Sequence, residues 1–176
     1  SYGSVNQSAL SGSDFTAVSG ALTFAPGVTT QTITVPILQD DIYEGSETLR
    51  INLSAPVNAT IADGTGIGTI LDNGTGSGGT DNDTPTLAVS SITVSDQSAG
   101  FATFVVSLSN PSASATTVSL ALANGSGVGN ASGSGVDYGA SGATNLQVST
   151  NNGATWVNAT SATIPANATY VLVRTP

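Results

Sequence analysis

Four of the chain's eleven acidic residues lie within eight positions, in a sequence of which only 7% of residues are charged. They are Asp40, Asp41, Glu44 and Glu47. Carboxylates at this density repel one another unless water solvates them or a cation lies between them. Hard oxygen ligands suit Ca²⁺, which accepts about six to eight oxygens in irregular geometry. The run therefore indicates either a calcium site or a solvated acidic turn, and density alone does not decide between them.

The composition leaves few groups for catalysis. His, Cys and Met are absent, and the only basic residues are Arg50 and Arg174. Ser–His triads and Cys nucleophiles are therefore excluded. Paired carboxylates hydrolyse glycosides, but such sites need an aromatic-lined cleft, and only 5% of the residues are aromatic. We expect no enzymatic activity.

The charge balance also restricts the partners. The net charge is −9, and two arginines form no basic patch, so we expect no nucleic-acid partner. No apolar run reaches membrane-spanning length, so we expect no membrane insertion. Without Cys there are no disulfides, and a metal is a common substitute in an extracellular chain. We expect a secreted, extracellular protein whose export signal lies outside this chain.

The elements that must position the acidic run are short strands. Ala21–Phe24 precedes a Pro–Gly turn, and Gln31–Ile37 then places Ile33, Val35 and Ile37 on one face. Four later segments repeat this alternation: Leu49/Ile51/Leu53, Leu87/Val89, Phe104/Val106/Leu108 and Val118/Leu120/Leu122. No segment has a helical period. Short strands separated by frequent turns predict an all-β sandwich.

A Gly/Ser/Asp-rich stretch over residues 73–84 predicts a linker between two domains, 1–72 and 85–176. Asp81 and Asp83 lie at its end, where they could also reach a metal at the junction. We therefore treat both as additional candidate ligands.

An internal repeat crosses this boundary. Gly12–Gly20 resembles Gly135–Gly142, and Phe24–Gly27 with the following alternation resembles Ile164–Arg174. The second copy carries an insertion over residues 143–160, which includes the single tryptophan, Trp156.

The two copies are not equivalent in extent. The first lacks counterparts of the predicted strands at 86–94 and 101–108, and the second stops before a counterpart of the acidic run. We therefore expect both sandwiches to be incomplete within this chain, which would join the back part of one domain to the front part of the next.

Five blocks in order resemble the Calx-β motif. They are Gly12–Phe15, Phe24–Gly27, Ile33–Val35, Asp40–Leu49 and Thr69–Asn73. The resemblance covers most of residues 10–73. Residues 84–176 resemble the variant copies that repeat in giant bacterial surface adhesins, especially over 148–156.

The resemblance implies tandem immunoglobulin-like sandwiches that bind Ca²⁺ through loops at one end. The family positions that supply carboxylate ligands match five residues here: Asp14, Asp40, Asp41, Glu44 and Asp72. Glu47 is a further candidate, and it also stands where the next strand is expected to begin. The second copy retains Asp137, without the acidic run that would complete a site.

These features lead to one functional hypothesis and several rivals. The first is a calcium-binding structural repeat of a secreted cell-surface adhesin or matrix protein, stiffened by Ca²⁺ at the domain junction and contacting neighbouring repeats. The alternative is a self-assembling extracellular fibre subunit, in which identical chains complete each other's sandwiches by strand complementation. A third class is a glycan-binding module that uses Trp156, although packing of Trp156 under the inserted hairpin is the competing interpretation.

Overall fold

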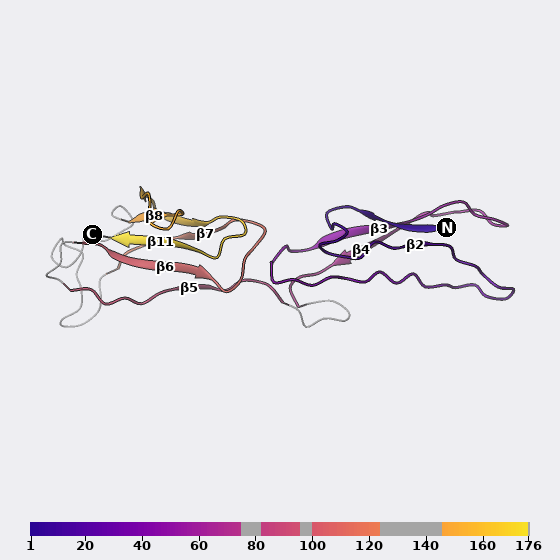
Figure 1. Ribbon diagram of the computed structural model, residues 1–176, viewed down its shortest axis with the longest axis horizontal. Coiled ribbons are helices and arrows are strands. Elements are labelled where there is room, and N and C mark those ends of the chain that lie inside the picture. Colours follow the sequence, from indigo (N-terminus) through magenta and orange to yellow (C-terminus); the bar gives the residue numbers. More distant parts are fainter. Residues whose placement is uncertain (75–81, 96–99, 124–145, 176) are drawn as a thin grey trace. The chain divides into compact units, whose positions relative to one another are not determined.

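Every regular element in the computed structural model is a β-strand, within the residues that it describes: 1–74, 82–95, 100–123 and 146–175. The chain divides into two compact units, Ser1–Asp83 and Thr84–Pro176, shown in Figure 1. In the described part of the chain, no helix is long and apolar enough to cross a membrane. The all-β prediction is confirmed, as expected for a chain in which Val and Thr favour strands while Ser and Gly favour the turns between them.

The first unit contains a four-stranded antiparallel sheet with the strand order β2-β1-β3-β4. Its strands are β1 (Tyr2–Asn6), β2 (Ser19–Gly20), β3 (Glu47–Leu53) and β4 (Thr65–Ile70). The predicted alternation of Leu49, Ile51 and Leu53 falls within β3. The register of β3 on β4 pairs Glu47 with Ile70, so the acidic run ends where β4 also ends.

A small apolar cluster packs inside the first unit. Phe15 is fully buried, and Ala9 and Leu49 pack with it. Three partly buried side chains complete the cluster: Val35, Ile51 and Ile70. The cluster therefore joins β3 and β4 to two segments that carry no strand of their own.

The strands expected at Ala21–Phe24 and Gln31–Ile37 are wrong. Residues 21–46 carry only isolated bridges, one of which pairs Ile37 with Phe15. A strand forms only where a neighbour supplies a ladder of hydrogen bonds. The turn between the two segments does form, since the Val28 N–H donates to the Ala25 carbonyl over 2.9 Å.

The second unit has a five-stranded sheet, β5-β6-β11-β8-β9, and a two-stranded sheet, β10-β7. The larger sheet consists of β5 (Leu87–Val89), β6 (Ala102–Leu108), β11 (Tyr170–Thr175), β8 (Gln147–Ser149) and β9 (Val157–Asn158). The smaller consists of β10 (Ser161–Ile164) and β7 (Thr116–Ser119). β11, the repeat counterpart of Gln31–Ile37, pairs with β6 from Tyr170 to Thr175. The counterpart strand forms here because β6 is present to pair with it.

The second unit has the larger core. Its buried members are Val106, Leu108, Leu146, Val148, Ala162, Ile164, Val171 and Val173. The alternation predicted for β6 is confirmed, because Val106 and Leu108 both face this core. β7 ends at Ser119, earlier than expected, but Leu120 and Leu122 still pack against the core.

Phe15→Ala should destabilise the first unit selectively. Removing a fully buried phenylalanine ring costs about 3–5 kcal/mol of unfolding free energy, since transfer energy is lost and a cavity remains. Denaturant unfolding of the full chain should show the transition of the first unit at lower denaturant and that of the second unit unchanged. Phe24→Ala is the matched control, because Phe24 is 51% exposed. Equal effects of the two substitutions would contradict this packing.

Candidate metal centre

Three carboxyl groups meet in the first unit. One oxygen from each of Asp14, Glu44 and Glu47 lies within 4.8 Å of the other two. Asp14 is 9% exposed, Glu47 is half-buried and Glu44 faces solvent. The group therefore combines a buried carboxylate with one that solvent can reach, an arrangement that an entering cation can use.

Backbone pairing holds Asp14 beside the chain that leads into the acidic run. The Leu38 N–H donates to the Asp14 carbonyl over 3.0 Å, and the Thr16 N–H donates to the Pro36 carbonyl over 2.8 Å. The Asp14 carboxylate accepts the Leu10 N–H over 2.5 Å, which fixes its side chain. Asp14 is therefore positioned by main-chain bonds on two sides, before any cation is considered.

The β3–β4 register brings the remaining groups together. Glu47 opens β3, and Asp72 follows the end of β4, beside the residues that precede Glu47. The Asp72 carboxylate accepts the Glu44 N–H over 2.6 Å. Gly45 has a φ of +80°, a left-handed conformation that suits glycine at the turn between the two glutamates. Although Glu47 does begin a strand, its carboxyl group still joins the cluster.

The other candidate ligands lie outside this group of three. Asp40 is exposed, and its carboxylate accepts the Ile42 N–H over 2.8 Å within the acidic run. Asp41 is exposed and Asp83 is half-buried; neither belongs to the cluster. Asp81 and Asp137 lie outside the described residues. Their assignment as ligands stays a prediction.

Partial burial and the crowding of negative charge raise the pKa of both glutamates. The pKa of Glu47 rises from an ordinary 4.5 to about 7, first because burial penalises its charge and then because of the charge of Asp14. A hydrogen bond with Asp14, which only protonated Glu47 can donate, adds to this shift, as do the charges of Glu44 and Asp72. The pKa of Glu44 is raised by partial burial first and then by Asp14 and Asp40. Without a cation, the site therefore binds protons in its place.

These residues fit a calcium ion. All the side chains offer hard oxygen donors, as Ca²⁺ requires, and the chain has no soft ligand such as Cys. Asp14, Glu44 and Glu47 would hold the ion, and Asp72 lies beside them through its bond to the Glu44 N–H. A bound divalent cation would supply the positive charge that the raised pKa values indicate is missing.

Trp156 is packed rather than presented as a flat platform. Its indole N–H donates to the Gly153 carbonyl over 3.0 Å, and the guanidinium carbon of Arg174 lies 4.0 Å from a ring centroid. The same guanidinium carbon lies 3.7 Å from the centroid of the Phe101 ring. The Arg174 Nε–H donates to the Gln147 side-chain oxygen over 2.8 Å. Sequence reasoning missed this stack, because Phe101, Trp156 and Arg174 are far apart in the chain.

In the metal-free protein, acidification should stabilise the first unit. Between pH 4.5 and about 7, folded Glu47 holds more protons than unfolded Glu47, so the unfolding free energy rises as pH falls through this range. Thermal melting in a chelator at pH 5, 6, 7 and 8 measures the trend. Glu47→Gln should flatten this dependence, while Asp63→Asn should leave it. A melting temperature that falls steadily on acidification from pH 8 to pH 5 would contradict the proton-sharing cluster.

Comparison with known proteins shows the family of the chain. The sequence model of the Calx-beta domain matches residues 1–74 and 80–163. Searches of curated proteins and of solved structures gave no match. Calx-beta domains are structural, non-enzymatic β-sandwiches that are associated with calcium binding. The chain belongs to the Calx-beta domain family, of which it carries two tandem copies.

Proposed function

We propose that the chain is a calcium-binding structural repeat of a secreted cell-surface adhesin or matrix protein. The observation that carries this proposal is the convergence of Asp14, Glu44 and Glu47 within 4.8 Å. The three residues come from two separate parts of the first unit, since Glu44 and Glu47 belong to the acidic run and Asp14 lies far from it in the chain. A cation between them would therefore crosslink the loop before β2 to the start of β3, which is a mechanical role.

The energetics support a stiffening role for the ion. Carboxylates that repel one another push their segments apart, whereas a shared divalent cation attracts all of them. Cation binding to the folded state adds directly to its stability. Since the apolar cluster of this unit has only three fully buried members among the described residues, this contribution would be large relative to the packing.

The position of Asp72 extends this effect toward the linker. Asp72 is bonded to the Glu44 main chain and directly precedes residues 73–84. An ion that orders Glu44 would therefore also order the point at which the chain leaves the first unit. This is the route by which Ca²⁺ would stiffen the junction between neighbouring repeats.

An extracellular setting agrees with the composition. The chain has a net charge of −9 and no cysteine, so neither disulfides nor a basic surface contribute to its stability or binding. A repeat of this kind would contact neighbouring repeats and would carry no catalytic site of its own.

Calcium should raise the melting temperature of the first unit, and a chelator should lower it. At a free concentration about 100-fold above the dissociation constant, binding adds about 2.7 kcal/mol to the unfolding free energy. Glu44→Gln and Asp14→Asn should remove most of this increment. Both are compared with Asp63→Asn, which changes the net charge equally but lies outside the cluster. An identical melting temperature of the wild-type chain with Ca²⁺ and with chelator would defeat the metal proposal.

A fibre subunit is the second candidate function, and one observation favours it. Gln31–Ile37 carries only an isolated bridge, whereas its repeat counterpart β11 pairs with β6 over the whole of Tyr170–Thr175. Phe24 and Ile37 are 51% and 53% exposed in and beside this segment, which forms no continuous strand ladder. The β6 segment of a second copy would fit here, since the same chain already pairs β6 with the counterpart. Such an exchange is strand complementation between identical chains.

Assembly of this kind should depend on concentration. Light scattering after size-exclusion chromatography should show polymers that grow with protein concentration. Thr34→Pro should abolish them, because proline removes a backbone donor from the pairing edge. Thr80→Pro, in the predicted linker, is the control and should still assemble. A monomer at all concentrations would contradict this second function.

A further inference from the structure

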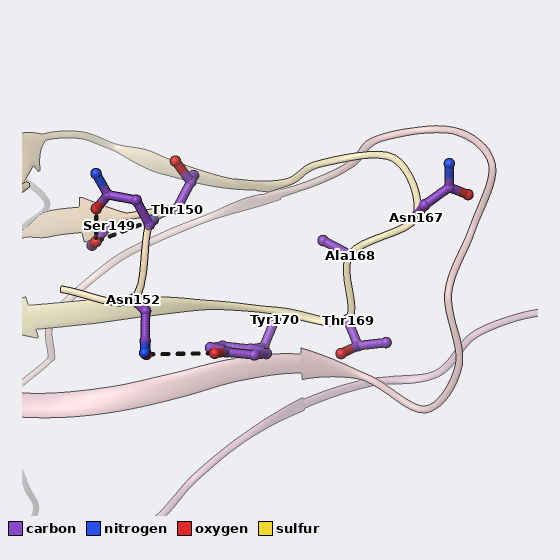
Figure 2. A pocket seen from close by; sticks show the side chains of 8 residues that line it. Ser149, Thr150, Asn152, Asn167, Ala168, Thr169 and Tyr170 are labelled. Atoms are coloured by element: carbon purple, nitrogen blue, oxygen red, sulfur yellow. Dashed lines mark hydrogen bonds between the residues drawn. The ribbon is translucent and has the colours of Figure 1, made fainter. Parts of the chain in front are cut away.

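A polar pocket lies at one end of the larger sheet of the second unit. Its volume is about 340 Å³, within the range of about 300–1,000 Å³ that small-molecule sites occupy. Figure 2 shows two turns that face one another across it. The lining residues are Ser149, Thr150, Asn151, Asn152, Asn167, Ala168, Thr169 and Tyr170. None of them carries a formal charge at neutral pH, so the pocket differs in chemistry from the acidic cluster.

The first wall is a rigid turn after β8. Ser149 is 1% exposed, and its hydroxyl oxygen accepts the Gly153 N–H over 2.9 Å. The Asn151 amide is fully engaged within the turn: its oxygen accepts the Thr155 N–H over 2.9 Å, and its nitrogen donates to the Thr155 hydroxyl over 2.7 Å. Ser149 and Asn151 therefore stabilise the turn and fix the position of Asn152, which lies between Asn151 and Gly153.

That residue, Asn152, turns its side chain toward the second wall. Asn152 and Gly153 have φ values of 56° and 85°, and the Ala154 N–H donates to the Asn151 carbonyl over 3.2 Å. Positive φ at both central positions is the pattern of a type I′ turn, for which Asn–Gly is the favoured pair. Figure 2 shows the Asn152 side chain pointing to the Tyr170 hydroxyl.

The second wall is equally fixed. The Ala168 N–H donates to the Pro165 carbonyl over 3.0 Å, and the Asn167 N–H donates to the Ser112 carbonyl over 2.7 Å. Asn167 has a φ of 62°, so this turn also has a left-handed residue at its tip. Tyr170 starts β11 directly after it, and pairing with β6 holds its backbone. Neither wall needs to be ordered by a ligand, which lowers the entropic cost of binding.

Tyr170 and Asn152 leave binding capacity unused. Tyr170 is 42% exposed although it is aromatic, and its hydroxyl donates only a long 3.4 Å hydrogen bond to the Asn152 oxygen. The Asn152 amide nitrogen has two donors beyond that contact. The Ala168 methyl group points into the space between the turns in Figure 2, so the floor is apolar. An aromatic ring, the Ala168 methyl group and the Asn152 amide, whose nitrogen has no hydrogen bond within the part of the chain that the structure describes, therefore border one cavity.

We propose that this pocket binds a neutral saccharide. A pyranose ring combines C–H groups on its faces with hydroxyls at its edge, and each hydroxyl both donates and accepts. The C–H face matches the exposed Tyr170 ring, while the Asn152 amide offers a donor and an acceptor to adjacent hydroxyls. The absence of charge among the lining residues disfavours carboxylated or sulfated sugars, and the net charge of −9 adds to this selection.

The proposed sugar pocket is separate from Trp156. Trp156 lies against Arg174 and Gly153 and does not line the pocket. It is also independent of the calcium cluster, whose three residues all belong to the first unit. Sugar binding and calcium binding can therefore fail or succeed separately, and a chain with both would anchor a calcium-stiffened repeat to a glycan.

Nuclear magnetic resonance titration of the full ¹⁵N-labelled chain tests the proposal. The probes are glucose, galactose, mannose and N-acetylglucosamine at millimolar concentration, with N-acetylglycinamide as a neutral peptide mimic. At least one sugar should shift the amide resonances of Asn152, Ala168 and Tyr170 in a saturable way, and the peptide mimic should not. No saturable shift with any sugar would overturn the proposal, as would shifts centred on Phe101 and Trp156.

Substitutions locate the binding groups. Tyr170→Ala should raise the dissociation constant of the sugar at least tenfold. Phe24→Ala removes a similarly exposed aromatic ring elsewhere and should leave the dissociation constant unchanged. Asn152→Asp keeps a residue that tolerates positive φ but removes the amide donors, so it should also weaken binding. It serves as the second variant if Tyr170→Ala perturbs the fold. Unchanged affinity in both pocket variants would overturn the assignment.

Discussion

The first unit depends on one constraint, which is that several carboxyl groups must share a small volume without driving their segments apart. Main-chain hydrogen bonds hold these segments together in part. The bonds between residues 14–16 and 36–38 and the register of β3 on β4 fix where Asp14, Glu47 and Asp72 stand. Burial and, after it, mutual repulsion then raise the pKa values of both glutamates, while the segments stay together. The site is therefore preorganised by the fold and is electrostatically incomplete without a proton or a cation.

Packing and charge are coupled in this unit through adjacent residues. Phe15, the fully buried centre of the apolar cluster, directly follows Asp14, and its bridge to Ile37 lies at the start of the acidic run. A substitution in the apolar cluster is therefore expected to shift the carboxylate of Asp14, and a change at Asp14 is expected to shift Phe15. Because the cluster is small, apolar burial alone leaves a modest margin against the conformational entropy of the chain. A bound cation would act at the point where that margin is smallest.

The sequence predicted the family and the fold class better than the individual strands. The acidic run, the family blocks and the all-β class follow from local composition and spacing, which is why they could be identified in the chain. The strands expected at Ala21–Phe24 and Gln31–Ile37 did not form, since alternation records a preference for extended backbone and says nothing of a partner. The pocket at Tyr170 was not anticipated either. Its two walls are turns whose proximity depends on the β11–β8 register, which no local pattern encodes.

The two copies differ in where their apolar and acidic side chains lie. The second has eight buried apolar residues in one cluster, and the carboxylate group of three lies in the first. If the proposed calcium site acts as argued above, the larger apolar core would let the turns of the second unit stay rigid when the calcium concentration falls. The first copy would respond to calcium through its stability. A repeat protein assembled this way can have a cation-dependent stiffness and a cation-independent surface, because the interactions behind each property lie in different units.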